Sequence, residues 1–163
     1  MLIIIDTNSS VQLPVISNWL KKYSDLDILV IDHHLSSDNL GTVNLVDTSV
    51  AAAGKIVYDL FGYADWTITP LIAESLFVAI STDTGWFRFS AADSEIYQTA
   101  AELIKAGANP TEIYAKLYQN YSPERMGLLK QMLNSIELHY DNTVAVQTLL
   151  RTDFDQTGAT GRD

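Results

Sequence analysis

Two short apolar runs, each followed directly by a carboxylate, constrain the fold of this chain more than any other feature. Residues 2–5 are followed by Asp6, and residues 28–31 are followed by Asp32-His33-His34. Runs that are apolar at every position are typical of strands buried on both faces of a parallel sheet. Open α/β sheets place their chemistry at the carboxyl ends of such strands. The sequence therefore predicts that Asp6 and the Asp-His-His triplet lie at the same sheet edge.

The segments around these runs predict an α/β fold with a helical second half. Ile16, Trp19, Leu20 and Tyr23 recur at helical spacing after Pro14, so the first 31 residues form a β-α-β unit with a right-handed crossover. Residues 42–46 form a plausible third strand. The later helices are expected to begin near capping residues, at Ser49 (with an end at Gly62), Thr69, Asp93, Asn109 and Ser122.

The sequence of the C-terminal third predicts that a second domain begins there. A stripe of apolar residues from Met126 to Tyr140 indicates one long helix, and residues 143–149 alternate like a strand that has no visible partner. Residues 151–163 are polar and predict no complete helix or strand. We therefore expect a first domain over 1–120, a connecting helix over 121–140 and the start of a second α/β domain over 141–163.

The amino-acid composition limits the kinds of molecule that this chain is expected to bind. Twenty acidic against ten basic residues give a net charge of −10, and no cluster of Lys and Arg offers a groove for long nucleic acid. A phosphate-ester substrate would then require multivalent cations, although acidity for solubility explains the total charge equally well. The chain has no cysteine, which excludes disulfides and thiolate chemistry. No apolar run approaches the length of a membrane span, and a cytoplasmic location is expected.

Taken in order, Asp6, Asp32-His33-His34 and the segment Asp83-Thr84-Gly85 resemble the DHH phosphoesterase superfamily. The resemblance spans nearly the whole chain and is closest to the RecJ-like branch of bifunctional oligoribonuclease/pAp phosphatases. It implies a Rossmann-like parallel sheet sandwiched by helices. The first domain would then be a partial DHH domain, and residues 141–163 would begin the DHH-associated C-terminal domain.

The resemblance also implies roles for individual residues. Asp6 matches the carboxylate that bridges two divalent metals, His33 the histidine ligand and Asp83 a later carboxylate ligand. His34 matches the histidine that faces the scissile phosphate and acts as an acid or an electrostatic clamp. Asp32 is expected to orient its neighbours. For Arg88, a contact with substrate phosphate and a solvated side chain are equally good interpretations.

Carboxylate and imidazole ligands together suit Mn²⁺ best, with Mg²⁺ or Co²⁺ as alternatives. Two such ions in the complete enzyme, about 3.5–4 Å apart, would activate water for attack on phosphorus. The expected substrates are short oligonucleotides or 3′-phosphorylated nucleotides such as pAp, without long duplex nucleic acid or membrane as partners. A homodimer is among the assemblies that the sequence leaves open.

Two features of the family's pattern are missing from this chain. Only five residues precede Asp6, so the family's first motif, a histidine and two aspartates, cannot be present, and neither is its Gly-Gly-Gly-His segment. We therefore expect a piece truncated at both ends, with little activity of its own. The alternatives are an inorganic pyrophosphatase or exopolyphosphatase of the same superfamily and a non-catalytic fragment. A dinucleotide-binding module is disfavoured because no Gly-x-Gly-x-x-Gly follows either strand.

Overall fold

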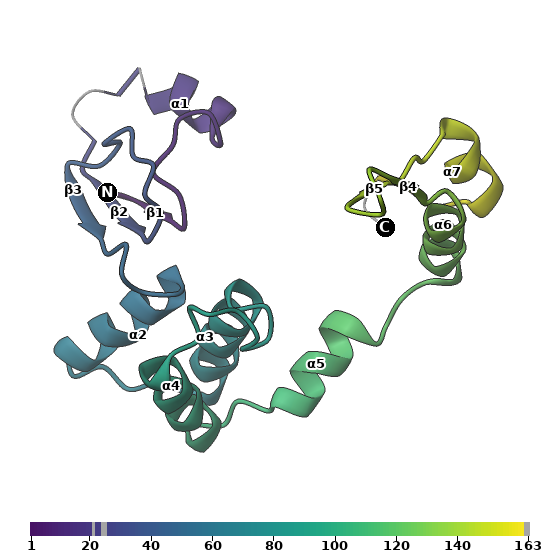
Figure 1. Ribbon diagram of the computed structural model, residues 1–163. Helices are drawn as coiled ribbons and strands as arrows, with labels where there is room; N and C mark the ends of the chain where they lie inside the picture. The colour runs from purple at the N-terminus through teal and green to yellow at the C-terminus, as the bar shows by residue number, and fades with distance from the viewer. Residues whose placement is uncertain (21, 24–25, 162–163) are drawn as a thin grey trace. The chain divides into compact units, whose positions relative to one another are not determined.

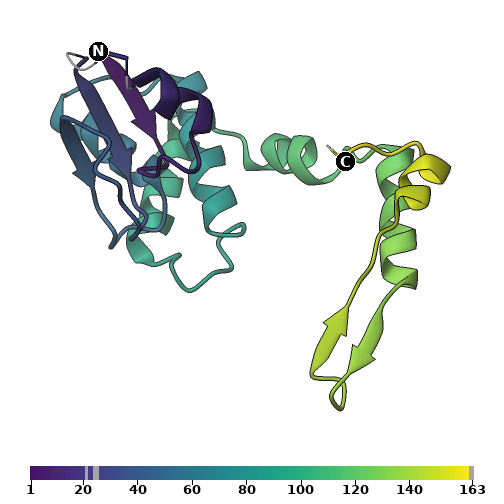
Figure 2. The same cartoon turned by 90° about the horizontal axis from the view of Figure 1, so that it is seen from above.

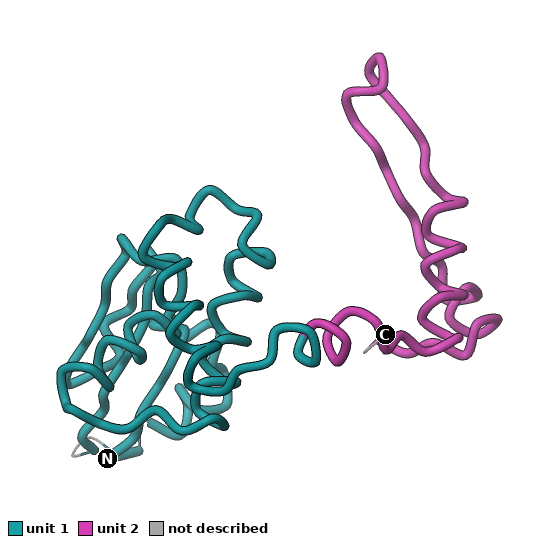
Figure 3. The backbone as a smooth tube through the Cα atoms, turned by 90° about the horizontal axis from the view of Figure 1, so that it is seen from below, with its two compact units in different colours: residues 1–113 teal, residues 114–163 magenta. Residues whose placement is uncertain are grey.

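The computed structural model describes residues 1–20, 22–23 and 26–161. The chain divides into two compact units, residues 1–113 and residues 114–163, shown in two colours in Figure 3. Each unit has its own secondary structure, and Figure 1 labels the elements. Among the described residues, no helix is both long enough and apolar enough to cross a membrane.

A three-stranded parallel sheet forms one side of the first unit. Strands β1 (Leu2–Ile5), β2 (Ile28–Asp32) and β3 (Val43–Val46) lie in the order β1-β2-β3, visible in Figure 2. Ile5 pairs with Ile31, and Asp32 pairs with Val46. The α/β class with a parallel sheet and helices is therefore confirmed, and this register brings Asp6 and the Asp-His-His triplet to one edge.

The central strand is buried because both of its faces are covered. Helix α1 (Pro14–Leu20) places Leu20 against the face formed by Ile4, Ile28 and Val30. Val30 is completely buried, and Ile31 on the opposite face is almost so. The first helix ends at Leu20, so Tyr23 lies beyond it, with its ring 4.5 Å from that of Trp19.

The helical part of the first unit is built around α3 (Pro70–Asp83), which packs between α2 (Ala53–Tyr63) and α4 (Ser94–Lys105). Its buried Phe77 and Ile80 meet Leu103 of α4 in one hydrophobic core. The predicted caps at Thr69 and Asp93 are present, since the Thr69 side chain accepts from the Ile72 amide and Asp93 accepts from two amides of α4. Helix α5 (Pro110–Tyr118) follows, and Asn109 accepts from its first amides.

The predicted start of α2 at Ser49 is wrong. The helix begins at Ala53, and its N-cap Ala52 makes no side-chain hydrogen bond. Ser49 instead donates its hydroxyl to Asp47 in the preceding turn, which removes it from the helix start. Burial fixes this end of the helix: Gly54 lies so close to α3 that an added Cβ would be 2.9 Å from the Ala79 Cβ. The helix also ends at Tyr63, one residue beyond Gly62.

The second unit corrects the prediction of one long helix up to residue 140. Helix α6 (Pro123–Asn134) ends where Ser135 caps it, and the Ser135 hydroxyl accepts from the Thr148 amide. Strand β4 (Glu137–His139) then pairs antiparallel with β5 (Val144–Val146) across a turn at residues 140–142. The predicted strand therefore pairs with residues 137–139, which the sequence had predicted to be part of the helix.

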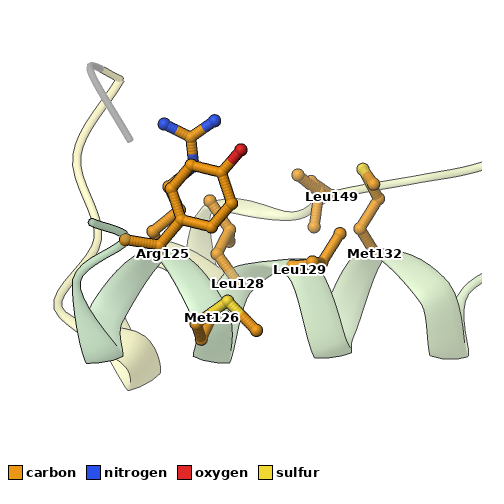
Figure 4. Close-up of a pocket in the computed structure, with 7 residues that line it drawn as sticks. Arg125, Met126, Leu128, Leu129, Met132 and Leu149 are labelled. Atoms are coloured by element: carbon orange, nitrogen blue, oxygen red, sulfur yellow. The ribbon is translucent and has the colours of Figure 1, made fainter. Parts of the chain in front are cut away.

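Residues 151–157 form α7, although the sequence predicted no element there. The Leu150 amide donates to the Asp153 carboxylate at the start of the helix, and Gly158 ends it at a φ of 74°. Among the residues of this unit that the structure describes, the buried hydrophobic ones are Leu128 and Ala159. A cavity of about 390 Å³ is lined by residues of α6 and by Leu149 (Figure 4). At its edge, the Arg125 guanidinium lies 4.2 Å from the centre of the Tyr121 ring.

Candidate metal centre

Asp6 occupies a strained position at the carboxyl end of β1. Its backbone has a φ of 67°, in the left-handed region that Asp tolerates better than most residues. The Asp6 amide still donates to the Ile31 carbonyl at 2.9 Å, so the strand's last pairing is kept while the backbone turns. The side chain is 55% exposed. Observed strain of this kind is found more often at functional sites than elsewhere.

His33 points its Nε2 atom at two carboxylates. This atom lies 3.2 Å from Asp83 Oδ2 and 3.5 Å from Asp6 Oδ1. The other ring nitrogen, Nδ1, lies 3.3 Å from the Val50 carbonyl oxygen, which can only accept a hydrogen bond. A neutral ring that donates from Nδ1 to this carbonyl would present the lone pair of Nε2 to a metal ion. The Nε2 atom is buried without a hydrogen-bond partner among the described residues.

Asp83 is the last residue of α3, where the helix dipole disfavours negative charge. Burial raises the pKa of the Asp83 carboxyl, and the nearby charge of Asp6 raises it further. The turn that follows is held by buried Thr84, whose hydroxyl donates to the Ile80 carbonyl and accepts from the Phe87 amide. The turn residues Gly85, Trp86 and Phe87 all have positive φ. The fold thus holds the Asp83 carboxylate in a position where its negative charge is unfavourable unless a cation lies nearby.

Asp32 fixes the ring of His34. It is completely buried, and its Oδ1 accepts from the His33 amide at 2.8 Å and from the His34 Nδ1 at 2.7 Å. This hydrogen bond, together with the charge of Asp32, raises the pKa of His34. With Nδ1 engaged, Nε2 is the nitrogen of His34 that is left to meet a ligand. The two histidine rings lie 4.5 Å apart, between centres.

The donor set fits a divalent cation. One ligand atom from each of Asp6, His33 and His34 lies within 4.8 Å of the others, and Asp83 reaches the same His33 nitrogen. Without a cation, the Asp6 and Asp83 carboxylates both approach one nitrogen of His33, and their mutual repulsion is unfavourable. A histidine that donates its second N–H to a backbone carbonyl is the usual arrangement around a protein-bound metal. Asp6 and Asp83 also line a cavity of about 270 Å³ between α2 and α3.

The structure thus brings together Asp6, His33, His34 and Asp83, with Asp32 behind the two histidines. The individual roles stay predictions. Arg88 is exposed, and its Nε donates to the Gly85 carbonyl of its own turn. Sequence reasoning missed Asn8, which is 1% exposed and connects the loops after β1 and β2. An asparagine in a polar loop gives no sequence signal of burial.

Comparisons with known proteins find relatives of this chain that share one name. The chain is 34% identical over 113 residues to the bifunctional oligoribonuclease and PAP phosphatase NrnA of Thermus thermophilus, a match that covers 69% of this chain and 35% of that protein. It is 32% identical over 135 residues to the protein of the same name from Mycoplasma genitalium, covering 79% of this chain and 42% of the relative. No family model matches the chain.

The fold is shared with a solved structure. An exopolyphosphatase-related protein from Bacteroides fragilis superimposes with a TM-score of 0.86 at 24% sequence identity, covering 98% of this chain and 48% of that one. The chain thus spans less than half the length of each of these relatives. The chain is thus similar over part of their length to oligoribonuclease and PAP phosphatases, and its motifs and fold are consistent with the DHH phosphoesterase superfamily.

Proposed function

We propose that this chain carries metal-binding residues of a metal-dependent phosphoesterase that hydrolyses short oligonucleotides or 3′-phosphorylated nucleotides such as pAp. The observation that carries this proposal is the convergence of Asp6 and Asp83 on the buried Nε2 of His33. The substrate class is supported by the names of the similar proteins, which are oligoribonucleases and PAP phosphatases.

Asp6, His33 and Asp83 would hold the metal. A divalent ion supplies Lewis acidity there, because it lowers the pKa of water and offsets the charge of a phosphate ester. Mixed carboxylate and imidazole ligands favour Mn²⁺, with Mg²⁺ or Co²⁺ as alternatives. Two ions belong to the complete enzyme in this proposal, and the ligands present in this chain would hold one of them weakly.

His34 would exchange the proton of the reaction. Asp32 holds the protonated Nδ1 of His34, so the ring orientation is fixed and Nε2 is directed away from the buried carboxylate. A ring held in this way can donate a proton from Nε2 to a leaving oxygen, or stabilise its negative charge. Asp32 therefore acts through His34 and does not contact substrate in this scheme.

The surface charge limits the substrate to small molecules. A net charge of −10 repels a long phosphate backbone, whereas a short substrate can be held by the metal and a few contacts. We assign the second unit, residues 114–163, to the start of the DHH-associated C-terminal domain, which would add such contacts in a longer protein.

A substrate panel with the enzyme in excess tests this function. The 163-residue chain would be incubated with Mn²⁺ and either pAp, a dinucleotide, pyrophosphate or tripolyphosphate, and the products separated by anion-exchange chromatography. We expect slow hydrolysis of the nucleotide substrates that is lost in Asp6→Ala. Hydrolysis confined to pyrophosphate or tripolyphosphate would reassign the substrate class, and hydrolysis that survives in Asp6→Ala would contradict the site.

A further inference from the structure

We propose that Asn8 and Asp38 form a reciprocal clamp that holds the loop after β1 against the loop after β2, so that Asp6 and His33 converge. This inference rests on the metal centre proposed above and adds two positioning residues to it. Neither residue belongs to the set of metal ligands or proton-transfer groups.

Asn8 reaches from the first loop into the second. Its side-chain amide donates to the Ser37 hydroxyl at 2.7 Å, and its side-chain oxygen accepts from the Leu40 amide at 3.0 Å. Its backbone carbonyl accepts from the Asp38 amide at 2.7 Å. The side chain is almost completely buried, so these hydrogen bonds are sheltered from water and costly to break.

Asp38 makes the return connection. Its Oδ2 accepts from the Ser10 amide at 2.7 Å and from the Ser10 hydroxyl at 2.8 Å, with a longer contact to the Ser9 hydroxyl at 3.4 Å. The carboxylate is exposed, unlike the Asn8 side chain. Each loop therefore supplies one polar side chain that binds the backbone of the other loop.

The positions of the clamp explain why it bears on the metal centre. Asn8 lies two residues after Asp6, and Asp38 lies five residues after His33. Asp6 has strained backbone at a strand end, so its carboxylate is held in place only if the following loop is held. Partners that orient metal ligands typically change metal affinity by about 10–100-fold when they are removed.

The test compares four variants of the 163-residue chain. Asn8→Ala and Asp38→Ala each open one side of the clamp, and Asp38→Asn keeps an oxygen acceptor while losing the charge. The matched control is Thr42→Val, which removes the hydrogen bonds of the Thr42 hydroxyl with the Ile28 amide and carbonyl at the opposite end of the sheet. Mn²⁺ affinity would be measured by electron paramagnetic resonance, and amide hydrogen exchange would be measured on the metal-free chain.

We expect Asn8→Ala and Asp38→Ala to weaken Mn²⁺ binding by about tenfold or more. Asp38→Asn should restore most of the affinity. Thr42→Val should lower the unfolding temperature and leave the affinity unchanged. Unchanged affinity in Asp38→Ala, or an equal loss in Thr42→Val, would overturn the clamp.

Hydrogen exchange separates this proposal from the metal centre itself. In Asn8→Ala the Leu40 amide should exchange faster, and in Asp38→Ala the Ser10 amide should do so, whether or not metal binds. If the wild-type chain bound no Mn²⁺, the proposed metal centre would fail, and with it the role of the clamp. If the wild-type chain bound Mn²⁺ but these amides kept their protection, the clamp alone would be wrong.

Discussion

Replacing Asp83 with asparagine should stabilise the metal-free chain and weaken its metal binding. Asp6 and Asp83 approach the same nitrogen of His33, at 3.5 and 3.2 Å, so their carboxylates lie close together. Two unit charges about 6 Å apart repel by about 0.7 kcal/mol in water and about 3 kcal/mol at an effective dielectric constant of 20. The side chains are 55% and 37% exposed, which favours the lower part of this range. We therefore expect Asp83→Asn to gain about 1 kcal/mol, or about 2–4 °C in unfolding temperature.

Calorimetric unfolding in EDTA and in Mn²⁺ tests this expectation. In EDTA the variant should unfold at the higher temperature. With Mn²⁺ at about ten times its dissociation constant, the wild type should gain about 1.4 kcal/mol from binding, which the variant largely loses, so the order should reverse. Asp65→Asn is the control, because it removes one negative charge from an exposed loop outside the site. A variant less stable than wild type in EDTA, or one that keeps the full Mn²⁺ shift, would refute the reasoning.

The remaining predictions concern pH, catalysis and backbone strain. The pKa of Asp83 is raised in the folded chain, so the folded state holds its proton to higher pH than the unfolded state, and stability falls as pH rises through this interval. The gain of Asp83→Asn in EDTA should therefore be small near pH 3 and grow towards neutrality, as thermal unfolding over pH would show. In the full-length parent enzyme, His34→Ala should lower turnover by about 10²–10⁴ while leaving metal content largely intact. Loss of the metal instead, seen by elemental analysis, would make His34 a ligand. Gly85→Ala should cost about 1–2 kcal/mol, because Gly85 has a φ of 56°, and should weaken Mn²⁺ binding through the turn after Asp83. Unfolding and metal titrations check this, and an unchanged unfolding temperature would contradict the strain.

The parts of the fold that the sequence predicted are those with strong local signals. Strands β1 and β2 are runs of apolar residues ended by a carboxylate, and Thr69 and Asp93 are capping residues that bind the amides expected of them. Asp6 and His33 converge because β1 and β2 are parallel and in register. The apolar runs predict the two strands, and the rule that parallel strands end at one sheet edge predicts the convergence.

The parts that sequence analysis missed depend on contacts between distant residues. The helical stripe of α6 continues to Ile136 and Tyr140, yet residues 137–139 pair with β5, because Ser135 ends the helix and binds Thr148. The burial of Asn8 depends on Ser37 and Leu40, which are 29 and 32 residues away in the sequence. The contact of His33 Nδ1 with the Val50 carbonyl involves a backbone group 17 residues away, which no side-chain pattern in the sequence indicates.

A titration of the metal-free chain with Mn²⁺ by isothermal calorimetry tests the central claim most directly. The account predicts weak binding with at most one ion per chain, lost in both Asp6→Ala and His33→Ala and retained in Thr42→Val. The absence of any binding, or binding that survives both ligand substitutions, would contradict the metal centre. Two tightly bound ions per chain would contradict the claim that the ligands in this chain hold only one ion weakly.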